Sequence, residues 1–101
     1  MTYDFLIDSY GTERVKVLSV WSEFTDDDLA VRPRSDDSRG RSVLEQMVHQ
    51  CVSEDTWFRT MLGIDIGTSA LPEQETRLAF MKHYADQSRK RLDRLRRTNE
   101  P

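Results

Sequence analysis

Three long segments of the chain repeat their apolar residues every three to four positions, which is the spacing of one face of an α-helix. The pattern predicts a first helix over about 3–23, a second over 43–62 and a third over 72–97. The stretch 24–42 is predicted as a connection, because it holds a proline, a glycine and a mixture of serine, aspartate and arginine residues. Since no segment alternates as a strand does, the sequence predicts an all-α fold.

The ends of the second and third segments carry helix-terminus signals. Ser42 followed three positions later by Glu45 fits a capping box, and Gly63 suits the left-handed residue that often follows a helix. Pro72 suits the first turn of the third helix. Short connections between long amphipathic helices are typical of antiparallel bundles, so we expect residues 1–101 to form one such domain.

Composition points to a protein outside the membrane. A third of the 101 residues are charged, and the formal net charge is -3. No apolar run approaches the roughly 20 residues that a membrane span requires, and the start of the chain lacks a signal-peptide pattern. The single cysteine, Cys51, cannot form an internal disulfide, which favours the cytoplasm. Cys51 lies in the apolar stripe of the second helix and is expected to behave as a small buried hydrophobe.

The third predicted helix ends in a run of basic residues, Arg89 to Arg97. Such a run can contact nucleic acid or another acidic partner. The favoured interpretation is that the cations complement the negative end of the helix dipole. No aromatic or glycine-rich recognition motif accompanies them, so the sequence does not favour a nucleic-acid-binding protein.

Two charged residues interrupt otherwise apolar stripes. Arg14 lies in the first stripe and Asp55 in the second, each near the middle of its helix. Buried charges are costly unless they pair, so we expect an ion pair between these two side chains. His83 lies opposite the apolar stripe of the third helix and is expected to face solvent.

Several short motifs follow one another along residues 3–97. In order they are Glu13-Arg14-Val15, Phe24-Thr25-Asp26-Asp27-Asp28-Leu29, Arg32-Pro33, Ser42-Val43-Leu44, and then His49, Glu54, Asp55, Trp57 and Leu62-Gly63. In this order and spacing the chain resembles the DinB-like (damage-inducible) superfamily of metalloenzymes. These are four-helix bundles that include the N-terminal domain of mycothiol-dependent maleylpyruvate isomerase and related thiol S-transferases.

The resemblance implies a metal site built around the second helix. In the family the histidine of that helix is a metal ligand, and this role falls on His49. The other two ligands usually come from a His-x-x-x-His or Glu-x-x-x-His pair on a fourth helix, which this sequence lacks. The resemblance therefore implies a metal-dependent thiol S-transferase type with an incomplete site, which would bind zinc or nickel only if further ligands were supplied. The alternative for His49 is a partly exposed or locally hydrogen-bonded histidine.

A four-helix fold that supplies only three helices is expected to leave an apolar groove. The side chains expected to line it are Leu6, Tyr10, Trp57, Met61, Met81 or Tyr84. Such a groove favours a homodimer, because a two-fold contact closes on itself. The alternative to the metal-dependent function is therefore a non-enzymatic helical protein that self-associates. A closed, monomeric three-helix core and a nucleic-acid-associated module remain further alternatives.

Overall fold

The computed structural model describes residues 3–33 and 40–99, which contain helices and no strand. The long helices are α1 (Asp4–Ser22), α2 (Val43–Leu62) and α3 (Arg77–Asn99), and a single 3-10 turn, η1 (Asp26–Ala30), follows α1. The all-α bundle predicted from the sequence is confirmed. The molecule is elongated, with extents of 53 × 23 × 21 Å. Positions 34–39 of the predicted connection lie outside the described residues.

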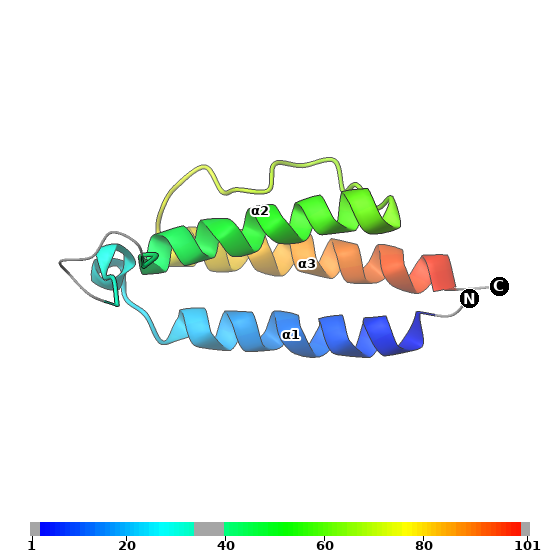
Figure 1. The fold of residues 1–101 in the computed structure, drawn as a ribbon, viewed down its shortest axis with the longest axis horizontal. Helices are drawn as coiled ribbons and strands as arrows, with labels where there is room; N and C mark the ends of the chain where they lie inside the picture. Colours follow the sequence, from blue (N-terminus) through cyan, green and yellow to red (C-terminus); the bar gives the residue numbers. More distant parts are fainter. Residues whose placement is uncertain (1–2, 34–39, 100–101) are drawn as a thin grey trace.

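The helix directions differ from the prediction. Helix α1 runs antiparallel to both other helices, but α2 and α3 start at the same end of the bundle and run parallel (Figure 1). The start of α3 lies beside the end of α1, where the backbone N–H of Arg77 donates to Asp26 Oδ1 at 2.7 Å and Arg77 Nη1 donates to Ser22 O at 3.3 Å. The prediction of a fully antiparallel bundle was therefore wrong for α2 and α3.

The long connection between α2 and α3 explains this topology. Residues 63–76 run back along the outside of the bundle from the end of α2 to the start of α3 (Figure 1). Side chains of α3 hold the connection in place. Gln87 Nε2 donates to Thr68 Oγ1 at 2.8 Å and also to the backbone oxygen of Ser69, and Arg94 Nη1 donates to Asp65 O at 3.4 Å. The connection thus forms a strap along α3 rather than a tight turn.

The third helix begins five residues later than its apolar pattern predicted. Pro72 lies in the strap, and Thr76 caps the helix instead. The backbone N–H of Ala79 donates to Thr76 Oγ1 at 3.1 Å, and that of Phe80 donates to Thr76 O at 3.0 Å. Threonine is a common N-cap residue, so Thr76 could have predicted the observed start of α3. The apolar pattern alone placed the start too early.

Both predicted termini of α2 are confirmed. The backbone N–H of Glu45 donates to Ser42 Oγ and that of Ser42 donates to Glu45 Oε1, each at 3.1 Å, which completes the capping box. Gly63 follows the helix with φ 66°, and its N–H donates to Phe58 O. Glycine adopts this left-handed conformation without steric cost.

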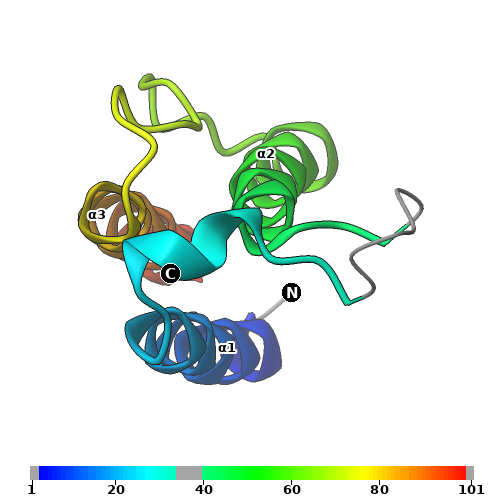
Figure 2. The ribbon, with the colours of Figure 1, turned by 90° about the vertical axis from the view of Figure 1, so that its left-hand side faces the viewer.

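The core divides into two clusters along the bundle axis. The first, at the η1 end, contains Trp21, Leu29, Met47, Cys51, Phe80 and Tyr84. The second lies toward the end of the bundle where α1 begins and α3 ends, and it contains Tyr10, Phe58, Ile64, Leu92 and Leu95. Each cluster takes residues from all three helices, and α1 and α3 form the closest helix pair. Viewed along the bundle axis, the three long helices lie at the corners of a triangle, and α1 and α2 form one of its edges (Figure 2).

Candidate functional site

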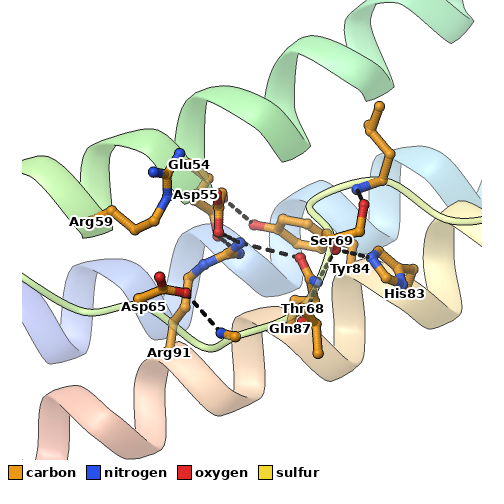
Figure 3. A network of polar contacts seen from close by, with 12 residues as sticks. Glu54, Asp55, Arg59, Asp65, Thr68, Ser69, His83, Tyr84, Gln87 and Arg91 are labelled. Atoms are coloured by element: carbon orange, nitrogen blue, oxygen red, sulfur yellow. Dashed lines mark hydrogen bonds and ion pairs between the residues drawn. The ribbon is translucent and has the colours of Figure 1, made fainter.

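A buried arginine lies between the two core clusters. Arg91 projects from α3 toward α2 and is 1% exposed (Figure 3). Its Nη1 lies 3.2 Å from Glu54 Oε1, and its Nη2 lies 3.4 Å from Asp55 Oδ1 and 3.2 Å from Gln87 Oε1. The guanidinium is therefore shared between two carboxylates of α2 and one amide of its own helix.

Glu54 collects further donors around the same carboxylate. Tyr84 OH donates to Glu54 Oε2 at 2.8 Å, Gln50 Nε2 donates to the same oxygen at 2.9 Å, and Tyr10 OH donates to Oε1. Burial and the neighbouring Glu54 carboxylate raise the pKa of Tyr10 and of Tyr84 above the ordinary tyrosine value. Both phenols thus stay protonated, and Glu54 links all three helices through one hydrogen-bonded network.

In the sequence, Arg91 belongs to the basic run of residues 89–97, and the pattern of apolar residues does not predict this network. The missed signal was its position. Arg91 lies one turn after Gln87 and Ser88 and directly before Leu92, within the buried stripe that continues to Leu95. An arginine in a buried stripe needs a carboxylate on the facing helix, and α2 offers Glu54 and Asp55.

The expected ion pair between Arg14 and Asp55 was wrong. Arg14 reaches α3 instead, where its Nε donates to Ser88 Oγ at 2.8 Å and its Nη2 donates to Ala85 O at 2.9 Å. Asp55 pairs with Arg91 and, at 3.0 Å, with Arg59 one turn along its own helix. The physical reason is that α1 packs most closely on α3, so the charges of α1 and α2 both meet α3 rather than each other.

His49 lies on the exposed surface of α2. Ser53 Oγ lies 3.2 Å from His49 Nδ1, one turn further along the same helix. Among residues 3–33 and 40–99, no group of three histidine, cysteine, aspartate or glutamate side chains could hold a metal ion. The residues present therefore do not fit the metal centre that the resemblance implies, and the role of His49 as a ligand stays a prediction.

The other two candidate residues, His83 and Cys51, contact the strap and the core. His83 is half-buried, and its Nε2 lies 2.7 Å from Ser69 O, so it contacts the strap rather than facing solvent as expected. Cys51 is 2% exposed and belongs to the first core cluster, which confirms its predicted place among buried apolar residues. Burial raises the pKa of the Cys51 thiol to about 12, so it is not a nucleophile at neutral pH.

A groove runs between α1 and α2 and consists of two adjoining hollows. The larger hollow has a volume of about 420 Å³ and is lined by Leu6, Ser9, Tyr10, Glu13, Gln50, Ser53, Glu54, Trp57 and Phe58. The smaller hollow has a volume of about 280 Å³ and is lined by Glu13, Lys16, Val17, Val20, Trp21, Gln46 and Gln50. Because Glu13 and Gln50 line both hollows, they form one continuous surface, which we call the α1–α2 groove.

The groove agrees only in part with the expected apolar surface. Leu6, Tyr10 and Trp57 line the larger hollow, and Trp57 is 43% exposed. Tyr84 was expected there but is buried in the core beneath Glu54. Met81 also packs against the first core cluster instead. Both predictions failed because they assumed that α3 borders the open side.

The basic end of α3 is partly neutralised by its own helix. Asp86 lies 3.2 Å from Arg89 Nη2 and 3.0 Å from Lys90 Nζ, and Arg96 Nη1 lies 3.7 Å from Asp93. These exposed pairs are spaced at i,i+3 and i,i+4 along the helix. Arg96 and Arg97 also lie in the last turn of α3, where the favoured interpretation expects cations that complement the helix dipole.

None of the helices in the described part of the chain is both long and apolar enough to cross a bilayer. Comparisons of the chain with protein-family models, curated proteins and solved structures found no match. The DinB-like resemblance therefore stays a prediction.

Proposed function

We propose that this chain is a non-enzymatic helical protein that self-associates, with the α1–α2 groove as the surface that binds a second copy. The observation that carries the proposal is the groove itself, whose hollows of about 420 and 280 Å³ adjoin along the face between α1 and α2. An open groove that exposes apolar side chains among polar ones is a candidate interaction site.

The side chains of the groove support a protein partner. Trp57 is 43% exposed and Val20 is 54% exposed, and both project from helices whose other faces are buried in the core. Exposed aromatic residues beside a pocket are typical anchors of protein interfaces. Burying apolar surface is worth roughly 25 cal/mol per Å², so covering the groove is favourable.

A second copy is the occupant to which the proposal commits. The middle of the groove carries one acid and one base, Glu13 and Lys16, and both are more than half exposed. A surface with one charge of each sign is complementary to itself under a two-fold rotation. Such a contact also closes without leaving a free binding surface.

The polar network supports a structural rather than a catalytic role. Glu54 lies at the floor of the larger hollow, but its carboxylate already accepts from Tyr10, Tyr84, Gln50 and Arg91. Every buried side-chain nitrogen and oxygen of the described residues has a hydrogen-bond partner. A network satisfied in this way stabilises the packing of the three helices.

The metal-dependent thiol S-transferase function implied by the DinB-like resemblance stays a prediction. It requires ligands that join His49, and elemental analysis of the purified protein tests it. A cytoplasmic location fits the self-association proposal, because the one thiol, Cys51, is buried and unpaired. Arg89, Lys90 and Arg96 pair with aspartates of their own helix, so the proposal does not include nucleic acid as a partner.

Solution mass tests the proposal. Light scattering over micromolar to near-millimolar concentrations should show the mass rising from 11.9 kDa toward twice that value. The midpoint of thermal unfolding should rise with concentration, because association stabilises the folded chain by mass action. A mass of one chain at every concentration would overturn the proposal.

A further inference from the structure

The two hollows of the α1–α2 groove are lined by different side chains of α1. The larger hollow surrounds Ser9 and Tyr10 near the start of the helix. Near the other end of the helix, Val20 stands beside the smaller hollow and is 54% exposed. The groove therefore carries a concave apolar site and a projecting apolar side chain on the same helix, about three turns apart.

We infer that the second copy binds antiparallel, around a two-fold axis that lies in the interface above α1, level with the step from Arg14 to Val15, and runs across the groove. This inference rests on the proposed self-association and specifies its geometry. The rotation reverses the direction of α1 and lays it over the same helix of the other copy. Val20 then faces Ser9 of the partner copy, so it enters the larger hollow beside Tyr10 and Trp57.

The same axis also brings opposite charges together. Lys16 of one copy faces Glu13 of the other, and the symmetric pair forms on the other side of the axis. Within one chain these side chains are 3.7 Å apart and 67% and 63% exposed, so both can exchange their partner for one in the second copy. One register therefore satisfies two independent features, the apolar fit of Val20 and the charge pair.

The alternative two-fold axis, which runs along the groove, gives a poorer match. It places α1 over α2 of the partner copy, so Glu13 faces Gln50 and Lys16 faces Gln46. Neither amide neutralises the charge opposite it, and Val20 no longer lies over the larger hollow.

Intermolecular disulfide formation tests the register. The variant carries Ser9→Cys and Val20→Cys, with Cys51→Ala to remove the native thiol. Within one helix these positions are roughly 16 Å apart at 1.5 Å per residue. This exceeds the roughly 7 Å between Cα atoms that a disulfide can bridge. Any disulfide between them must therefore join two chains.

We expect mild oxidation to convert most of the variant into a covalent dimer, in which mass spectrometry finds peptides linking positions 9 and 20. The single variants Ser9→Cys and Val20→Cys, in the same background, should stay largely uncrosslinked. A dimeric mass under reducing conditions without a 9–20 link would overturn the register and leave self-association standing. A monomeric mass of the unchanged protein at the same concentrations would overturn both.

Discussion

At the scale of single residues, the stability of the fold depends on the carboxylates that pair with the buried guanidinium of Arg91. Arg91 is 1% exposed and contacts Glu54, Asp55 and Gln87. A buried ion pair need not stabilise a protein relative to apolar residues, but removal of one partner leaves an uncompensated charge. Glu54 is the more important partner, because it also accepts from both buried tyrosines.

Replacing Glu54 should therefore destabilise the protein strongly. We expect Glu54→Ala to lower the free energy of unfolding by about 3–5 kcal/mol, because it leaves buried Arg91 with only the longer contact to Asp55 as its ion pair and leaves two phenols without an acceptor. The matched control is Asp93→Ala, since the Asp93 side chain is 53% exposed, lies outside the groove and should contribute within about 0.5 kcal/mol. Urea unfolding followed by circular dichroism measures both. Equal losses for the two variants would contradict this account of the network.

Cys51 gives the protein a defined sensitivity to alkaline pH. The thiol has a pKa of about 12 in the folded protein, whereas an unfolded thiol titrates near pH 9. Below pH 9 both states keep the proton. Above it only the unfolded state loses the proton, so the free energy of unfolding falls by about 1.4 kcal/mol per pH unit. Tyr10 and Tyr84 add to the fall above about pH 10, where unfolded tyrosines ionise.

The Cys51→Ala variant isolates this effect. Its free energy of unfolding, measured between pH 8 and 10, should stay nearly level up to the tyrosine range, while that of the unchanged protein declines from about pH 9. Parallel curves for the two proteins would show that the thiol is not protected in the folded state.

At the scale of helices, the sequence predicted where the helices lie along the chain better than how they are oriented in the bundle. The capping box at Ser42 and the glycine at Gly63 placed α2 correctly, because both signals act within a few residues. The start of α3 was misplaced because Pro72 also suits an extended strap, and the cap at Thr76 was overlooked. The direction of α3 depends on contacts of the strap with Gln87 and Arg94, and no local pattern encodes such contacts.

Two glycines should respond in opposite ways to alanine. Gly11 lies inside α1 with ordinary helical geometry, and a Cβ there would be 4.0 Å from Leu92 Cδ2, so Gly11→Ala should stabilise by about 0.5–1 kcal/mol. Gly63 has φ 66°, so Gly63→Ala should destabilise by about 1–2 kcal/mol despite open space around it. Thermal unfolding measures both signs. Destabilisation by both substitutions would mean that α1 and α3 approach more closely than described.

At the scale of the molecule, the strap decides which face stays open. Because residues 63–76 run along the outside of the bundle beside α3, the described residues leave the groove between α1 and α2 open. An open apolar face is predictable from three amphipathic helices, and three of the side chains expected there, Leu6, Tyr10 and Trp57, line the groove. The position of Val20 in the groove could not be predicted, because its neighbours there depend on how α1 packs beside α2.

The comparison of two exposed valines of α1 tests self-association through the groove most directly. Val20 and Val15 are 54% and 55% exposed, but Val20 lines the groove, while Val15 lies on another face beside Arg96. Sedimentation equilibrium of Val20→Arg and Val15→Arg should show at least a tenfold weaker dimer for Val20→Arg. Val15→Arg should associate like the unchanged protein, with both variants folded by circular dichroism. Equal association of the two variants, or a monomeric unchanged protein, would contradict the account.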